Sequence, residues 1–104
     1  MENNSTVRPP DFLAHHDGDV VAVAVHDLSP GLAEGGYLHG PASVSVDLSD
    51  PVPLGHKLAL VDVPEGGAIT EYGVRVAIAT RDIKAGQHVH VHNVRSARWQ
   101  SSVA

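Results

Sequence analysis

The sequence predicts an all-β fold, and three observations lead to that prediction. Short runs of alternating apolar residues recur along the chain, the apolar residues are mainly Val, Ala, Leu and Ile, and Gly, Pro and Asp separate the runs. Branched side chains of this kind pack well on pleated surfaces, and short apolar runs bounded by turn residues are typical of strands. The 104 residues are near the common size of one domain, so we expect a single folded unit.

One pattern occurs three times: an alternating apolar run, then Asp, an aliphatic residue, two variable residues and Gly. The three copies are VAVAVHDLSPG (21–31), LALVDVPEGG (58–67) and VAIATRDIKAG (76–86). Asp can accept a hydrogen bond from the backbone just ahead of it, and Gly can adopt the positive φ that closes a tight turn. Each copy is therefore predicted to be a strand that ends in a turn, with Asp27, Asp62 and Asp82 paired to Gly31, Gly66 and Gly86.

The remaining segments are assigned in chain order. Residues 1–11 are polar, contain Pro9-Pro10 and are predicted to form a flexible arm before a folded domain at 12–94. Within that domain, residues 35–53 are expected to form a loop or hairpin containing the half-exposed strand SVSVDLSD, and a helix near 32–34 would be one turn at most. The tail at 95–104 is too short for a second domain, and Trp99 is expected to pack back on the β unit.

Composition excludes several function classes. The chain has no cysteine, which removes disulfides, thiolate nucleophiles and cysteine-based metal sites. No apolar run approaches the roughly 18 residues needed to span a membrane, and the N-terminal segment lacks the apolar core of a signal peptide, so we expect a cytoplasmic protein. The net charge of −5 argues against non-specific binding of nucleic acid.

Charge is nevertheless distributed unevenly along the chain. From residue 75 onward there is one acid, Asp82, and five basic residues: Arg75, Arg81, Lys84, Arg95 and Arg98. This basic last third is either a solvated face or a surface that meets an acidic substrate or partner.

The segment GQHVHVHNV (86–94) carries a histidine at every second position. On a strand, His88, His90 and His92 would form a row on one face, about 6.5–7 Å apart, with Val89 and Val91 on the buried face. One metal ion at about 2.0–2.1 Å from each imidazole nitrogen could be reached by two neighbours in this row but hardly by all three. A metal site would need a ligand from elsewhere, and the alternative is a polar strand face.

A second polar cluster, HHDGD (15–19), precedes the first predicted strand. Imidazole and carboxylate are donors for Zn, Fe(II) or Mn and groups for acid–base chemistry near neutral pH, although such a loop is equally typical of a plain turn. His26, His39 and His56 are single histidines for which surface or hydrogen-bonding roles are expected. Because the chain has no nucleophile elbow, phosphate loop or dinucleotide fingerprint, we expect only part of an active site, completed by another polypeptide.

Several stretches, in this order, resemble the SAF-type domain of altronate and galactarate dehydratases, a module that also serves as the small subunit of sulfolactate sulfo-lyase. They are His16-x-x-Asp19-x-Val21-Ala22-Val23-Ala24, Gly55-His56-Lys57-x-Ala59-Leu60, Tyr72-Gly73, Ala79-Thr80-x-Asp82-Ile83-x-x-Gly86 and His88-Val89-His90-Val91-His92-Asn93. The resemblance covers most of residues 12–94. It departs from the family at Val20, where a polar Asn is usual, and at Val76-Ala77, which replace an Ile-Gly pair.

The resemblance implies a β-clip fold and a role in a metal-dependent carbon–oxygen lyase. The implied reaction is dehydration of a sugar acid such as altronate or galactarate, or elimination of sulfite from a sulfolactate-like acid. The implied cofactor is a divalent metal, Fe(II) first and Mn or Zn as alternatives, and the implied partner is a large catalytic lyase subunit.

The resemblance also assigns candidate site residues. Those for catalysis are His16, His88 and His92; those for metal binding are Asp19, His90 and His92; those for substrate binding are His56, Lys57, Tyr72 and Asn93. Two alternatives stay open. One is a non-catalytic SAF module that binds an acidic carbohydrate or a protein partner, and the other is a β-clip domain that forms homo-oligomers through exposed strand edges.

Overall fold

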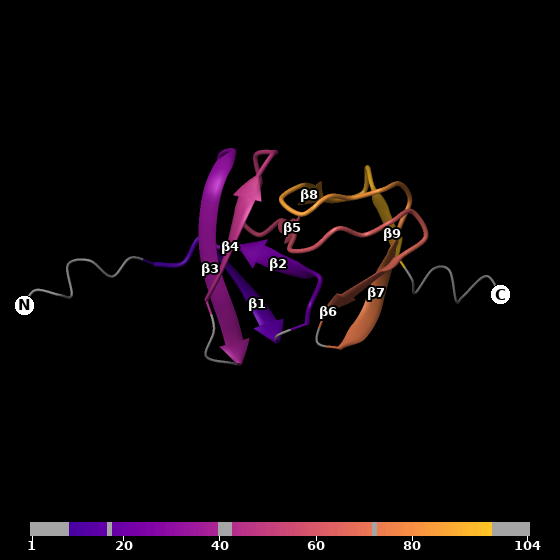
Figure 1. Ribbon diagram of the computed structural model, residues 1–104, viewed down its shortest axis with the longest axis horizontal. Coiled ribbons are helices and arrows are strands. Elements are labelled where there is room, and N and C mark those ends of the chain that lie inside the picture. The colour runs from indigo at the N-terminus through magenta and orange to yellow at the C-terminus, as the bar shows by residue number, and fades with distance from the viewer. Residues whose placement is uncertain (1–8, 17, 40–42, 72, 97–104) are drawn as a thin grey trace, which may run out of the picture.

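The computed structural model describes residues 9–16, 18–39, 43–71 and 73–96, and no helix occurs in these ranges. Within them the chain forms nine strands (Figure 1): β1 Phe12–His16, β2 Val21–Ala24, β3 Gly31–His39, β4 Ser43–Leu48, β5 Lys57–Ala59, β6 Ala68–Glu71, β7 Val74–Ala79, β8 His88–Val89 and β9 Val94–Ser96. The predicted all-β class, and with it the SAF-like fold, is confirmed. The expectations for residues 1–8 and for Trp99 lie outside the described residues.

The strands form two sheets. The larger has the order β4-β3-β1-β2-β5-β8 and the smaller the order β6-β7-β9. All described pairings are antiparallel except that of β1 with β3, which is parallel. In Figure 1, β5 and β8 lie in the middle of the molecule, between the long strands of the larger sheet and the smaller sheet. Strand β9 extends beyond residue 94, where the folded domain was expected to end.

Alternation explains β4, and pairing with β4 explains β3. In β4 the side chains of Val46 and Leu48 are buried while those of Ser45 and Asp47 are exposed, as the sequence predicted for a half-exposed strand. The single helical turn considered near 32–34 does not form. Residues 31–36 instead pair with 43–48 of β4, which satisfies their backbone groups in a ladder.

The three predicted turns form, but their Asp side chains bond differently from the expectation. Gly31, Gly66 and Gly86 have φ values of 129°, 83° and 93°. The carboxylates accept N–H groups from distant turns rather than from their own: Asp27 from Leu54 at 2.9 Å, Asp62 from Ala85 at 2.9 Å and Asp82 from Glu65 at 2.8 Å. The turns at 62–66 and 82–86 therefore cap each other, and paired backbone bonds between Val63 and Ile83 at 2.7 and 2.8 Å join them.

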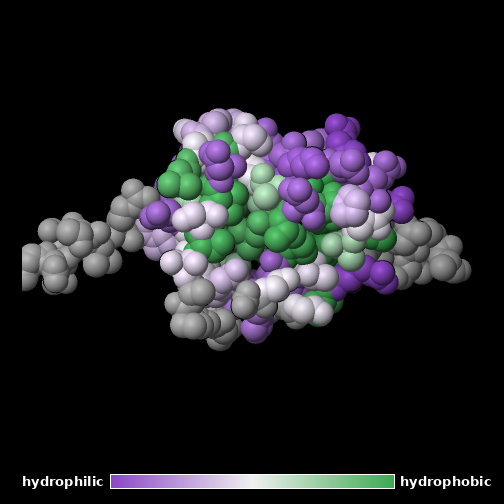
Figure 2. Space-filling model, viewed as in Figure 1, coloured by the Kyte–Doolittle hydropathy of each residue, from purple (hydrophilic) through white to green (hydrophobic). Residues whose placement is uncertain are grey.

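The core consists of two clusters of buried side chains. The first surrounds Phe12 and Leu58 in the larger sheet, and the second contains Val21, Ile69 and Val89 and joins the two sheets. Figure 2 shows apolar side chains across the middle of one face and hydrophilic ones gathered over β8 and β9. None of the described residues belongs to a helix long and apolar enough to cross a membrane.

A histidine cluster beside a groove between the sheets

Four histidine rings lie together at the edge of the larger sheet that β5 and β8 form. The ring centroid of His56 lies 4.7 Å from that of His90 and 5.1 Å from that of His88. The ring centroid of His88 lies 5.4 Å from that of His90 and 5.5 Å from that of His92. We call His56, His88, His90 and His92 the histidine cluster. The sequence pattern predicted that the last three lie together but did not include His56. His56 directly precedes β5, and it lies beside the others because β5 pairs with β8 in the register Lys57↔Val89.

The last two histidines lie in a turn and not on a strand. Strand β8 ends at Val89, and the backbone N–H of Asn93 donates to the carbonyl of His90 at 3.0 Å. The expectation that Val89 and Val91 share a buried face is half wrong, since Val89 is 4% exposed and Val91 is 81% exposed. The turn swings Val91 outward and shortens the predicted histidine row into a compact group.

Asn93 shapes this turn from inside. Its side chain is buried, its Oδ1 accepts the N–H of His90 at 3.0 Å, and its Nδ2 donates to the carbonyl of His88 at 2.9 Å. The structure thus places Asn93, a candidate for substrate binding, beneath the cluster, where it sets the backbone path from His88 to His92.

His56 and His88 form the closest contact in the cluster. Nδ1 of His56 lies 2.9 Å from Nε2 of His88, and the two ring planes differ by 26°. The centroid separation of 5.1 Å is close to the nitrogen separation plus the two ring radii, so each nitrogen lies near the line between the ring centres. Such head-on, nearly coplanar geometry is that of an N–H···N hydrogen bond between imidazoles.

The environment of His88 disfavours its charged form. Partial burial first, and then the neighbouring imidazoles of His56, His92 and His90, lower the pKa of His88, while Asp50 opposes the shift. Asp50 contacts the backbone of His88 and not its ring: Oδ2 of Asp50 accepts the backbone N–H of His88 at 3.0 Å. The neutral form of His88 is therefore favoured over the charged form.

An open groove of about 770 Å³ runs beside the cluster, between the two sheets. Apolar side chains from both sheets line it, among them Ile69, Ala77 and Val89. Its polar lining comes from residues 56 and 57, just before and at the start of β5, from β6 and from the segment 90–96, and consists of His56, Lys57, Glu71, His90, Arg95 and Ser96. Two of the expected substrate-binding residues, His56 and Lys57, thus line one groove, while Tyr72 lies outside the described residues.

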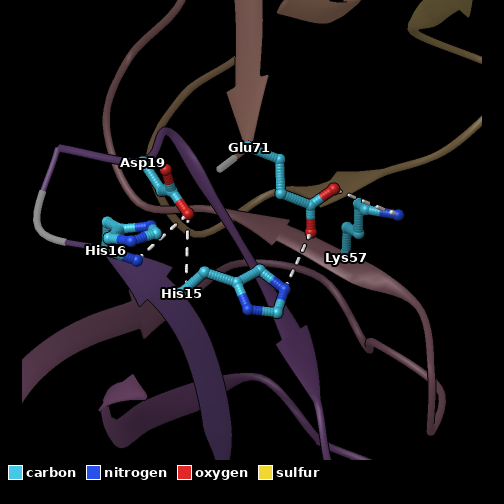
Figure 3. A network of polar contacts seen from close by, with 5 residues as sticks. All are labelled: His15, His16, Asp19, Lys57 and Glu71. Carbon is cyan, nitrogen blue, oxygen red and sulfur yellow. Dashed lines mark hydrogen bonds and ion pairs between the residues drawn. The ribbon is translucent and has the colours of Figure 1, made fainter. Parts of the chain in front are cut away.

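A second polar network includes two residues of the groove lining, Lys57 and Glu71. Figure 3 shows the side chains of His15 and Lys57 directed at the carboxylate of Glu71, whose oxygens lie 4.0 Å from His15 Nε2 and 3.9 Å from Lys57 Nζ. Glu71 is only 14% exposed, and sequence reasoning missed it because a single acid at a strand end carries no motif.

The remaining candidates, His16 and Asp19, lie around the turn before β2. Oδ2 of Asp19, which is 5% exposed, accepts the backbone N–H groups of His15 and His16, each at 3.3 Å. The side chain of His16 is exposed at the end of β1. Asp19 therefore supports the backbone that directs His15 towards Glu71.

The donor types suit a divalent metal, but their arrangement does not form a complete site. Among the residues that the structure describes, no three His, Asp or Glu side chains are placed to hold one ion, so Asp19, His90 and His92 do not assemble as a ligand set within this chain. The closest nitrogens, in His56 and His88, face each other instead of converging on a third point. Fe(II), Mn or Zn would need ligands from outside the described residues.

Comparisons with known proteins agree with the fold. The family model described as the altronate/galactarate dehydratase SAF domain matches residues 10–97. A protein of Chromohalobacter salexigens named (2R)-sulfolactate sulfo-lyase subunit alpha is 35% identical over 94 residues, covering 86% of this chain and 97% of that protein. Altronate dehydratases of Bacillus subtilis and Escherichia coli are 34% and 39% identical; each alignment covers 82% of this chain but only 16% of the dehydratase.

Proposed function

The chain belongs to the altronate/galactarate dehydratase SAF domain family, and from that premise we propose that it is the small subunit of a metal-dependent carbon–oxygen lyase. The proposed reaction is dehydration of a sugar acid such as altronate or galactarate. Elimination of sulfite from a sulfolactate-like acid is the alternative; it is also a β-elimination, but it breaks a carbon–sulfur bond. The observation that carries the proposal is the pairing of a nearly full-length match to a lyase alpha subunit with a histidine cluster beside an open groove.

The groove suits an acidic substrate. Lys57 and Arg95 are cationic, and His56 and His90 can donate hydrogen bonds, so four of its polar groups favour a carboxylate. The single acid, Glu71, is offset by Lys57 and by His15. The apolar lining of the groove excludes water from part of the ligand, which strengthens the electrostatic attraction between the carboxylate and the cationic groups.

A second chain is needed because this site is open and incomplete. The groove faces solvent, and the described residues supply imidazoles without a full set of metal ligands. In the proposed enzyme a large subunit closes the groove and supplies the ligands of the metal, with Fe(II) expected first and Mn or Zn as alternatives. A bound divalent ion would stabilise the negative charge that develops on the substrate carboxylate.

This chain's own contribution is to hold the acid and move protons. Lys57 and Arg95 would bind the carboxylate, and the histidine cluster would exchange protons at the carbon that is deprotonated and at the leaving group. His88 and His92 belong to that cluster, whereas His16 and Asp19 would act from the neighbouring turn.

The test is recovery of the partner followed by reconstitution. Affinity purification of the chain from its native lysate should retain a much larger dehydratase-like polypeptide in equal amounts. The complex should dehydrate hydroxy acids or release sulfite, and His92→Ala should abolish turnover while the circular dichroism spectrum stays unchanged. Full activity of His92→Ala would remove that residue from the site. Recovery of the chain alone under gentle conditions would favour a binding module for acidic carbohydrate or protein.

A further inference from the structure

We propose that His56 is the residue of this chain that takes the proton from the substrate, and that His88 is a positioning residue that fixes which nitrogen of His56 faces the groove. The inference rests on the proposed function and assigns separate roles within the histidine cluster. Its basis is the contact between Nδ1 of His56 and Nε2 of His88 at 2.9 Å.

The two rings have different access to a ligand. His56 lines the groove, whereas His88 is not among the residues that line it. Because Nδ1 of His56 is engaged by His88, Nε2 is the nitrogen of His56 left for a ligand. His90 stacks on His56 with 4.7 Å between centroids and 10° between ring planes, which restricts rotation of the His56 ring.

His88 is held firmly enough to orient its neighbour. Its backbone pairs with Leu58 of β5, its N–H donates to Asp50 Oδ2 at 3.0 Å, and its carbonyl accepts from Asn93 Nδ2 at 2.9 Å. These contacts come from three separate segments of the chain. They fix the Cα of His88 and thereby the direction from which its Nε2 approaches His56.

One proton lies between the two rings, and its position sets the chemistry at the groove. When His56 donates through Nδ1–H, its Nε2 carries a lone pair and can act as a base. A proton taken up at Nε2 makes His56 an imidazolium, whose Nδ1–H forms a stronger, charge-assisted bond to His88. His88 therefore stabilises the form of His56 that the proton transfer creates.

The proposed step balances within the substrate and His56. The proton on the carbon next to the carboxylate moves to Nε2 of His56, and its electron pair forms a carbon–carbon double bond. The bond from the neighbouring carbon to the leaving group breaks, and its electron pair leaves on hydroxide or sulfite. Where hydroxide leaves, the proton on His56 is returned to it as water.

The first experiment uses the isolated chain and needs no partner. In long-range proton–nitrogen NMR spectra, the ring nitrogens of His56 and His88 should show separate protonated and unprotonated shifts, with a scalar coupling between the two facing nitrogens. His88→Gln should remove the coupling. Tautomer-averaged shifts in both rings of the wild-type chain, with no coupling, would overturn the positioning role.

The second experiment measures turnover in the reconstituted complex. His56→Gln should lower kcat by about 10²–10⁴-fold, the usual contribution of a general base. His88→Phe should lower kcat with KM unchanged, and His88→Gln, whose amide can still accept from Nδ1–H, should restore part of the loss. His26→Gln is the matched control, because His26 is exposed and bonds to Asp11 outside the groove.

The two hypotheses fail in different ways. An active wild-type complex in which His56→Gln keeps full turnover would overturn the role of His56 and leave the proposed function standing. A wild-type complex without lyase activity would overturn the proposed function and the proton transfer with it. The NMR coupling would still decide whether His88 orients His56.

Discussion

Gly86 lies directly against the backbone carbonyl of Asp47, and a β-carbon at position 86 would overlap that oxygen. The carbonyl of Gly86 also accepts the N–H of Ser49 at 3.1 Å, and two residues later the N–H of His88 donates to Asp50 Oδ2 at 3.0 Å. The segment 47–50 therefore holds the backbone that carries His88 into the histidine cluster.

Gly86→Ala should destabilise the chain much more than Gly66→Ala. Both glycines close the same Asp-to-Gly turn with positive φ, 93° and 83°, so both substitutions carry a backbone cost of about 1–2 kcal/mol. Only at position 86 does the new methyl meet backbone, which adds about 1–3 kcal/mol, whereas nothing lies within 4 Å of a β-carbon at Gly66. Urea denaturation followed by circular dichroism measures both; equal losses would contradict the Asp47 contact.

Asn93→Ala should lower the free energy of unfolding by about 2–3 kcal/mol, because the two hydrogen bonds that its buried side chain makes to the turn are lost. Gln87→Ala is a matched control, since its side-chain amide accepts the Lys84 N–H at 2.9 Å at an exposed site and its loss should cost about 0.5 kcal/mol. NMR spectra of the Asn93 variant should also show displaced His88 and His90 ring signals. Unchanged ring signals would mean that the cluster does not depend on Asn93.

The strands and turns could be predicted because their determinants are local. Alternation of Val with polar residues fixes which face of β4 is buried, and positive φ at the end of each Asp-to-Gly turn needs Gly. The destinations of the Asp carboxylates could not be predicted. Asp62 bonds to Ala85, 23 residues away, and nothing in the spacing of one turn reveals which other turn faces it.

The histidine cluster could be predicted only in part, because one of its members comes from a distant segment of the chain. Histidines two residues apart are neighbours on any strand, but His56 is 32 residues from His88 and meets it only because β5 pairs with β8. The exposure of Val91 was misjudged because alternation was extended through Asn93. An Asn after the last histidine is a turn signal, and it could have shown that the strand ends early.

The stability of the wild-type chain relative to His88→Gln should fall as the pH is lowered through the ordinary histidine range. The pKa of His88 is lowered in the folded chain by burial and by the imidazoles of His56, His92 and His90, against the opposing charge of Asp50. The unfolded chain therefore binds this proton first, and acid favours unfolding. Above the ordinary histidine pKa, both states are neutral at this site and the effect is absent.

The measurement is the urea-unfolding free energy of the wild type minus that of His88→Gln, from about pH 8 to about pH 5. Taking the difference removes the contribution of carboxylates that titrate alike in both chains. The difference should decrease as the pH falls. A difference that stays constant or grows would show that the folded chain does not disfavour the charged His88.

Metal content should distinguish the isolated chain from the complex. Since no three described donors are placed around one ion, and since His56 and His88 face each other in a hydrogen bond, the purified chain should hold well below one equivalent of Fe, Mn or Zn after dialysis. In the complex, one ion per site is expected, and a chelator should abolish activity that Fe(II) restores. If the isolated chain held a full equivalent, its side chains would have to rearrange on binding. Loss of that metal in a His90→Gln, His92→Gln double variant would then place the ligands in the turn after β8. In that case the large subunit would be expected to close the groove but not to complete the metal site.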